Sequence, residues 1–269
     1  MPLIEHKGKQ VHYLLRGSGP KEVVLLHGFL GDSSIWDRYA SDLDESYTIL
    51  RIDLAGHGLS DNISEVHTME VMAEPVIAVM NFVGMRSAHF VGHSMGGYVA
   101  MAIAEKEKSL VLSLCLLNST PVEDSELKKR DRIRTIRLID LSPELFVSEA
   151  INNLFTLENL EQYSEVVKEL KELGLKSALK GAAPALRGMA ERKDMCSFLR
   201  RNEFPVLFLS GMHDNIIPIQ SVIEKADATG SQIEILEKTN HMGFIEEYDL
   251  TLSLLQSFWE NLRSTLKKL

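Results

Sequence analysis

Hydrophobic positions along the chain follow two alternating patterns. Short runs that are apolar almost throughout and end at glycine or a polar residue are typical of strands buried on both faces of a sheet. Between them, apolar residues recur every three or four positions, as on the buried face of a helix, most clearly at residues 69–83. The predicted strands cover residues 22–28, 47–58, 88–92, 109–118, 204–211 and 231–237, and further predicted helices follow Gly97 and cover 250–266.

This alternation of strands and helices predicts parallel β-α-β units with helices on both faces of one sheet. Two short segments at residues 3–6 and 10–15 flank a Lys-Gly-Lys turn signal and predict an antiparallel hairpin at one edge of that sheet. The expected fold class is therefore α/β, with a mostly parallel, doubly wound sheet and an antiparallel edge hairpin.

One long segment, residues 121–201, interrupts the alternation because it contains no convincing strand pattern. Helical spacing appears in it at 127–140, 144–154 and 161–173, and Gly174, Gly181, Pro184 and Gly188 interrupt that spacing. We interpret this segment as an inserted α-helical unit. The predicted core domain then consists of residues 1–120 and 202–269.

The composition, with 45% hydrophobic and 25% charged residues among 269, is ordinary for a soluble globular protein. The formal net charge of -9 repels phosphate backbones and anionic lipid, so we expect no nucleic-acid partner. The first ten residues lack the apolar core of a signal peptide, and no segment approaches the roughly 18 apolar residues of a membrane span. We therefore expect a cytoplasmic location and no membrane association. The sequence gives no indication of the oligomeric state.

The two cysteines give no sign of a metal site. Cys115 lies in an apolar run and Cys196 is far away in sequence, and neither belongs to a spacing typical of metal ligands. We expect inert thiols, no bound metal and no organic cofactor.

The chemistry of the chain centres on Gly92-His93-Ser94-Met95-Gly96, where a predicted strand meets a predicted helix. A serine on such a tight turn exposes its hydroxyl above the sheet, beside the first backbone N–H groups of the helix. The hydroxyl becomes a nucleophile when a neighbouring base takes its proton. A glycine-rich turn can arise by chance, but the strand-turn-helix context favours a nucleophilic Ser94.

A nucleophilic serine of this kind requires an acid and then a histidine, each after a later strand. Asp214 follows the predicted strand at residues 204–211. His241 is the only one of nine histidines that follows the last predicted strand, at residues 231–237. We predict a triad of these residues with Ser94. Glu123 and Asp124 stay open as alternative acids because they follow an earlier strand whose end could approach the same imidazole.

The oxyanion that forms during acyl transfer needs two backbone donors. We predict the N–H group of Met95, directly after the serine, and that of Phe29, in the loop after the strand that ends near His27. A tight loop that happens to carry an aromatic residue is the alternative for Phe29, and His213 is expected only to line its loop.

Five motifs occur in one order between residues 25 and 244: LLHGFLGDSSIW, DLAGHGLSD, GHSMGG, GMHDNIIP and NHMGF. Together they resemble the α/β-hydrolase superfamily, specifically its lidded esterases. The resemblance implies the α/β-hydrolase fold and a helical cap domain at residues 121–201, inserted after the sixth strand and covering the pocket. Relatives that dehalogenate haloalkanes or hydrolyse epoxides have an aspartate nucleophile, so Ser94 argues against those activities.

The motifs also resemble the menaquinone-pathway synthase, which eliminates pyruvate with the same triad. Its relatives carry an arginine four residues after the nucleophile to hold a carboxylate, whereas this chain has Tyr98, which we predict to contact substrate. The basic run at residues 128–137 could supply such cations. We favour a solvated helix face there, with Ile133, Ile136 and Ile139 turned inward.

The predicted function is hydrolysis of small carboxylic esters through an acyl-enzyme, with a small-molecule ester as the partner. A pyruvate-eliminating lyase and a carbon–carbon bond hydrolase are alternatives that use the same triad. A non-catalytic ligand receptor is an alternative of another class, because fold does not fix function. The presence of the serine, the histidine and the oxyanion glycine argues against it.

Overall fold

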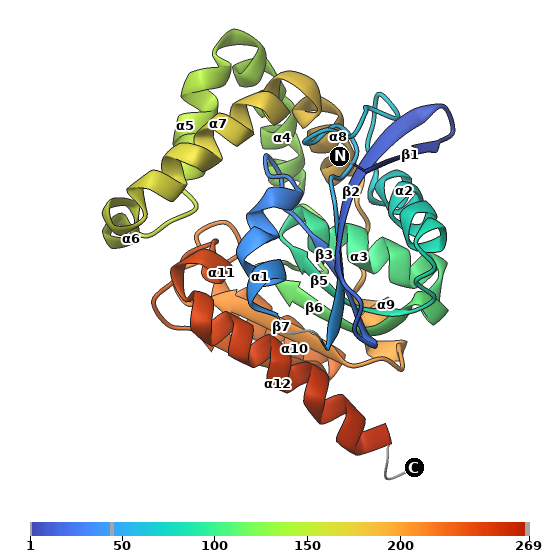
Figure 1. Ribbon diagram of the computed structural model, residues 1–269. Helices are drawn as coiled ribbons and strands as arrows, with labels where there is room; N and C mark the ends of the chain where they lie inside the picture. The colour runs from blue at the N-terminus through green and yellow to red at the C-terminus, as the bar shows by residue number, and fades with distance from the viewer. Residues whose placement is uncertain (1, 44–45, 267–269) are drawn as a thin grey trace.

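The computed structural model describes residues 2–43 and 46–266, and within them eight strands form one sheet (Figure 1). The strands lie in the order β1-β2-β4-β3-β5-β6-β7-β8. Their bounds are β1 Leu3–His6, β2 Lys9–Gly17, β3 Lys21–Leu26, β4 Tyr47–Ile52, β5 Ala88–His93, β6 Val111–Leu117, β7 Val206–Gly211 and β8 Gln232–Leu236. The pairs β1–β2 and β2–β4 are antiparallel and the others are parallel, as the sequence predicts.

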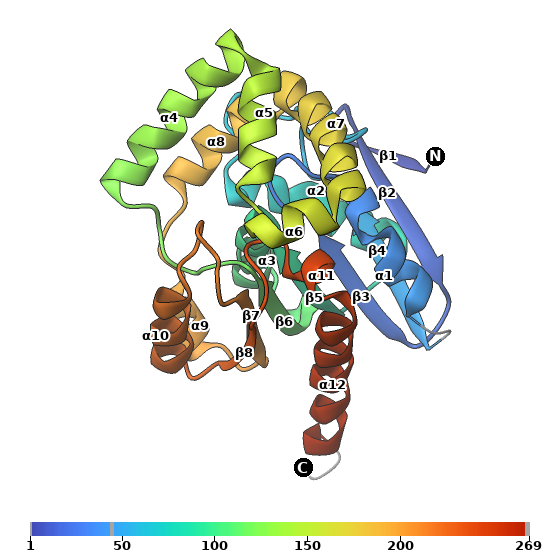
Figure 2. The ribbon, with the colours of Figure 1, turned by 90° about the vertical axis from the view of Figure 1, so that its left-hand side faces the viewer.

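The central strands are apolar because both faces of the sheet are covered. Val23 to Leu26 of β3 and Leu114 to Leu117 of β6 are essentially inaccessible to solvent. Helices α1 and α12 cover one face, and α2 and α3 cover the other (Figures 1 and 2). The edge strand β8, by contrast, alternates between exposed and partly buried residues.

Outside the segment between β6 and β7 the described residues form six α-helices, and the three that the sequence predicts lie close to their expected positions. Their bounds are α1 Asp37–Asp42, α2 Met69–Phe82, α3 Met95–Lys106, α10 Ile219–Thr229, α11 Gly243–Glu246 and α12 Tyr248–Leu266, with short 3₁₀ turns η1 Ser33–Trp36 and η2 Lys108–Leu110. The sequence analysis missed α1, α10 and α11. Of these, α1 and α11 are short, and α10 follows a proline that ends the loop after β7.

Between β6 and β7 the chain forms helices joined by loops and no strand, all of it within the described residues, as predicted. It contains α4 Glu126–Leu141, α5 Pro143–Asn152, α6 Leu157–Gln162, α7 Ser164–Lys180, α8 Ala182–Glu191 and α9 Cys196–Arg201. Helices α4 to α8 lie over the ends of the strands rather than over a face of the sheet (Figure 2). The division of the chain into a core domain and an inserted cap domain stays a prediction.

Several details of the sequence analysis are wrong in this segment. Gly181 does separate α7 from α8, but Pro184 and Gly188 lie within α8 and Gly174 lies within α7. A Cβ atom at Gly174 would come 3.0 Å from Val147 of α5, so this glycine allows close helix packing. The basic run of α4 is also not uniformly solvated. Arg132 pairs with the buried Asp124, while Ile133 is 47% exposed instead of turned inward.

Candidate active site

Ser94 lies at a sharp turn between β5 and α3, in a backbone conformation that side chains rarely adopt (φ 50°, ψ −114°). The turn closes tightly because its neighbours have no side chain. A Cβ atom at Gly92 would come within 2.5 Å of the backbone of Gly96, and one at Gly96 would collide with the carbonyl oxygen of Leu26. The motif therefore folds as a strained elbow that holds the serine hydroxyl above the sheet.

Three side chains from different strand ends form one hydrogen-bonded chain at this elbow. Nε2 of His241 lies 2.9 Å from Oγ of Ser94, and its Nδ1 lies 2.8 Å from Oδ2 of Asp214. Asp214 follows β7 and His241 follows β8, so adjacent parallel strands deliver both residues to the same edge of the sheet. In this geometry the imidazole can accept the serine proton while the carboxylate orients the ring.

The carboxylate of Asp214 is held in its charged form. Burial by itself would raise its pKa, but the charge of the neighbouring imidazole and several donated hydrogen bonds outweigh burial, so the pKa lies below its usual value. Oδ1 accepts from the backbone N–H groups of Ile216 and Ile217 at 2.9 and 2.8 Å. Oδ2 accepts from the side-chain amide of Asn118 at 2.9 Å.

The two alternative acids have other partners. Asp124 is buried between Arg132 and Arg192, and its Oδ1 lies 2.6 Å from Nη2 of Arg192. Glu123 is exposed and lies 3.8 Å from Nζ of Lys129. Among the candidate acids, Asp214 is therefore the one that the structure brings to His241.

The predicted oxyanion donors lie on two segments that meet at the serine. Met95 is the first residue of α3, and Phe29 follows Gly28 in the loop after β3. A Cβ atom at Gly28 would come 2.6 Å from Nδ1 of His93 and 3.3 Å from the Cβ of Ser94, so the lack of a side chain lets this loop pass close to the nucleophile. The roles of the two N–H groups stay a prediction.

Tyr98 lies in the first turn of α3 and is only 5% exposed. The guanidinium carbon of Arg192 lies 4.1 Å from the centre of its ring, so a residue that joins α8 to α9 covers the tyrosine. Its predicted contact with substrate is not tested by this packing. His213 is exposed beside Asp214, as expected of a residue that only lines its loop.

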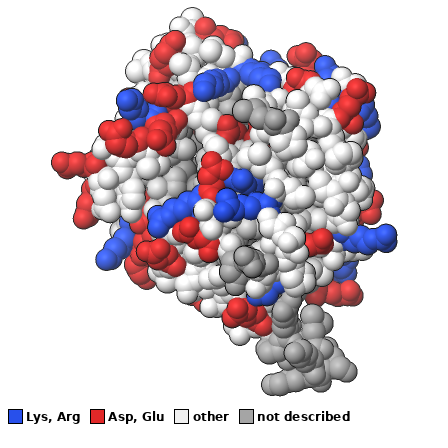
Figure 3. Space-filling view, in the orientation of Figure 1, with Lys and Arg blue, Asp and Glu red and all other residues white. Residues whose placement is uncertain are grey.

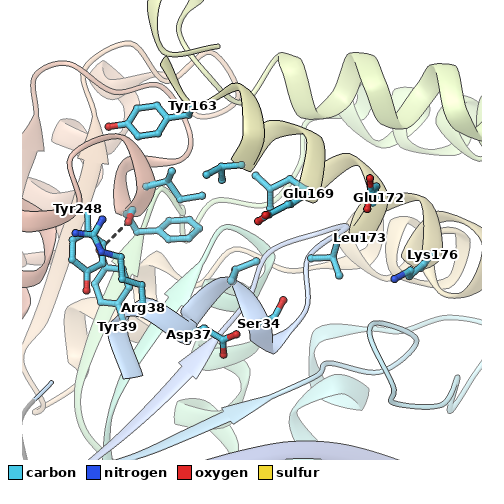
Figure 4. A pocket seen from close by; sticks show the side chains of 15 residues that line it. Ser34, Asp37, Arg38, Tyr39, Tyr163, Glu169, Glu172, Leu173, Lys176 and Tyr248 are labelled. Atoms are coloured by element: carbon cyan, nitrogen blue, oxygen red, sulfur yellow. Dashed lines mark hydrogen bonds between the residues drawn. The ribbon is translucent and has the colours of Figure 1, made fainter. Parts of the chain in front are cut away.

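A groove of about 480 Å³ lies where α7 meets η1, α1 and the start of α12 (Figure 4). Its floor is apolar, and its rim carries Glu169, Glu172 and Lys176 of α7 opposite Asp37 and Arg38. Acidic and basic side chains are interspersed across this side of the molecule (Figure 3). The volume is within the range of small-molecule sites.

The groove adjoins a small apolar chamber next to the elbow. The chamber is lined by Phe29, His93 and Met242, which are neighbours of the predicted oxyanion loop, of Ser94 and of His241. Ile35 and Leu170 line both spaces and thus separate them.

Two polar residues of the site were missed by the sequence analysis. Asn118, at the end of β6, donates to Asp214 and to the carbonyl oxygen of Asn240. Glu246 is buried five residues after His241 and accepts hydrogen bonds from that histidine's loop. For Asn118 the available signal was a polar residue that closes an apolar strand, whereas Glu246 stands beside Glu247 and Asp249 and gives no such signal.

No group of three or more metal-binding side chains occurs in residues 2–43 and 46–266. In the same part of the chain no helix is both long and apolar enough to cross a membrane.

Comparison with known proteins agrees with the fold. Residues 21–138 match the family model for the alpha/beta hydrolase fold. The chain is 29% identical over 258 residues to the pimeloyl-[acyl-carrier protein] methyl ester esterase of Methylococcus capsulatus, covering 90% of this chain and 95% of that protein. A solved structure of a thermophilic esterase from Thermogutta terrifontis superposes with a TM-score of 0.89 at 27% identity, covering 97% of each chain.

A third relative is longer than this chain. The chain is 27% identical over 251 residues to the dihydrolipoyllysine-residue acetyltransferase component of the acetoin cleaving system of Cupriavidus necator, covering 89% of this chain but 64% of that protein.

The protein therefore has the alpha/beta hydrolase fold, and the predicted fold class is confirmed. The relatives that it resembles over nearly its whole length are named as esterases, in agreement with the resemblance that the sequence motifs indicate.

Proposed function

We propose that the protein is a serine hydrolase that cleaves small carboxylic esters through an acyl-enzyme. The observation that carries this proposal is the hydrogen-bonded chain from Ser94 through His241 to Asp214 at a strained elbow. The esterase relatives support it because their names assign ester cleavage to proteins that match nearly all of this chain.

In the proposed mechanism, Oγ of Ser94 attacks the ester carbonyl while Nε2 of His241 takes its proton. Asp214 accepts the Nδ1–H bond and stabilises the imidazolium that forms. The imidazolium then protonates the departing alkoxide, which leaves as the alcohol. A water molecule, deprotonated by the same histidine, releases the acid and restores the serine. The backbone N–H groups of Phe29 and Met95 are proposed to hold the oxyanion in both halves.

We propose further that the helical segment at residues 121–201 acts as a cap and that substrate reaches Ser94 beneath it. The groove beside α7 and the chamber beside Phe29 support this role because cap and core contribute to the lining of both. The charged rim of the groove carries both signs, which favours esters without a fixed charge on the bound chain.

Fluorophosphonate labelling tests this function directly. The reagent should attach to Ser94, and Ser94→Ala should lose both the label and hydrolysis of p-nitrophenyl butyrate while keeping the melting temperature of the parent. Ser197→Ala, a change at an exposed position of α9, is the matched control and should keep both. An adduct mapped to another residue would contradict the proposal.

The lyase alternative is tested in the same assay series. An esterase should release p-nitrophenol from the acetate or butyrate ester and no pyruvate from the menaquinone precursor. Pyruvate release at a much higher kcat/KM than any ester hydrolysis would establish the alternative. The absence of turnover with either substrate, together with unlabelled Ser94, would favour a non-catalytic receptor.

A further inference from the structure

The loop that carries His241 leaves the edge strand β8 and enters the four-residue helix α11. The position of the imidazole in such a loop depends on what holds the residues on either side of it. A buried carboxylate, that of Glu246, supplies a large part of this support. Glu246 is 7% exposed, and within the described residues its carboxylate forms hydrogen bonds with Thr156, Asn159, Asn240 and Met242 rather than with Ser94 or Asp214.

One oxygen of Glu246 binds the histidine loop. Oε2 accepts the backbone N–H of Asn240 at 2.9 Å and that of Met242 at 3.3 Å. These two residues flank His241 directly, so a single oxygen atom fixes the backbone on both sides of the imidazole.

The other oxygen of Glu246 binds the proposed cap. Oε1 accepts the side-chain amide of Asn159 at 2.7 Å and the backbone N–H of Thr156 at 3.3 Å. Thr156 is the N-cap residue of α6, so the carboxylate also lies at the positive end of that short helix. Burial raises the pKa of Glu246, and the accepted hydrogen bonds oppose that rise by favouring the charged form.

Other bonds join the same two segments. The backbone N–H of His241 donates to the carbonyl oxygen of Leu154 at 2.9 Å. The side-chain amide of Asn240 donates to the carbonyl oxygens of Phe155 and Asn153 at 2.9 and 3.1 Å. The turn between α5 and α6 is therefore bonded along its length to the loop of the histidine.

We propose that Glu246 is a positioning residue that keeps His241 within hydrogen-bond distance of Ser94. Through Glu246 this alignment also depends on how the α5–α6 turn packs against the histidine loop. The inference rests on the proposed hydrolase function, since it assigns to Glu246 an effect on the proton transfer. Loss of the carboxylate charge should loosen both segments together, because each of its oxygens serves one of them.

The test is Glu246→Gln, which keeps the size of the side chain but turns one acceptor into a donor that faces N–H groups. We expect kcat for p-nitrophenyl butyrate to fall about 10- to 100-fold per active site, with KM changed less than about threefold. Active sites are counted by the burst of p-nitrophenol. Glu247→Gln is the matched control, since Glu247 binds only the backbone N–H of Lys238 in this loop and should keep kcat within about twofold.

A spectroscopic readout separates this inference from the proposed function. The Nδ1 proton of His241, shared with Asp214, should give a low-field proton NMR signal in the parent that is lost in His241→Ala. Glu246→Gln should broaden or shift that signal, and Glu247→Gln should keep it. This outcome can be observed even in a protein that hydrolyses no ester.

Unchanged kcat per titrated site together with an unchanged NMR signal would overturn the inference and leave Glu246 with a purely structural role. If Glu246→Gln does not fold, Asn159→Ala replaces it, because Asn159 lies on the cap side and its amide donates to Glu246 and to the carbonyl oxygen of Lys238 in the histidine loop. We then expect kcat per site to fall about 3- to 10-fold with KM retained. No change in this variant would show that the α5–α6 turn is not coupled to the histidine.

Discussion

Asp214 and Asp124 each follow a strand of the same sheet, and their different environments distinguish them. Asp214 receives two backbone N–H groups and an amide and lies against the imidazole of His241. Asp124 has a fully buried side chain that neutralises Arg132 and Arg192, and thereby joins α4 and the end of α8 to the loop after β6. One carboxylate can orient a base, whereas the other holds cations in place.

Substitution of each aspartate should therefore affect a different property. We expect Asp214→Asn to lower kcat by about 10³- to 10⁴-fold, the scale found when a triad acid is neutralised in a serine protease. Asp124→Asn should keep kcat per folded molecule but lower the free energy of unfolding by about 3 kcal/mol, because two arginines lose a buried partner. Steady-state kinetics and urea unfolding measure the two effects, and the reverse ranking of kcat would move the acid to Asp124.

At the scale of elements, the shape of the groove depends on how α7 lies against the core. The groove in Figure 4 has one wall from this helix and one from η1 and α1. Leu173 of α7 lines the groove, while Leu179 of the same helix is 70% exposed and lies outside it. A chain of methylene groups in such a groove would gain about 0.8 kcal/mol for each group removed from water.

A bulky residue in the groove should therefore reduce the preference for longer esters. We expect Leu173→Trp to lower kcat/KM for p-nitrophenyl octanoate about tenfold and to change that for the acetate less than twofold, since the acetate has no chain to place there. Leu179→Trp is the control and should change neither. An equal loss for both esters would indicate a general disturbance of α7 rather than a filled groove.

At the scale of the whole molecule, burial determines how stability depends on pH. Burial lowers the pKa of His57 to about 3, of His67 to about 4 and of His93 to about 3. In an unfolded chain a histidine titrates near 6.5. As pH falls below that value, these histidines become protonated in the unfolded chain but stay neutral in the folded protein. Folding therefore becomes less favourable.

We therefore expect the free energy of unfolding to be constant near pH 7.5 and to decrease from about pH 6.5 toward pH 4. Each such histidine contributes up to about 1.4 kcal/mol per pH unit. Urea unfolding at pH 7.5, 6 and 5 measures the slope. His67→Gln should reduce the slope, because it removes one of the linked groups, and a stability independent of pH over this range would contradict the linkage.

The sequence by itself determined the strands, most of the longer helices and their order. Burial on both faces leaves a continuous apolar run, so β3, β5, β6 and β7 could be recognised, and the glycines at 92 and 96 indicated the elbow. The helical nature of residues 121–201 followed from helical spacing at three stretches together with the absence of a convincing strand pattern. These features could be read because each depends on residues close together in the chain.

Only the tertiary structure decided which distant side chains meet. Asp124 pairs with Arg132 and Arg192 rather than with His241, and Glu246 joins the histidine loop to the α5–α6 turn. The exposure of Ile133 was also misjudged, because helical spacing defines a face but not the neighbour it packs against. Contacts between loops depend on the packing of whole elements, which local periodicity does not encode.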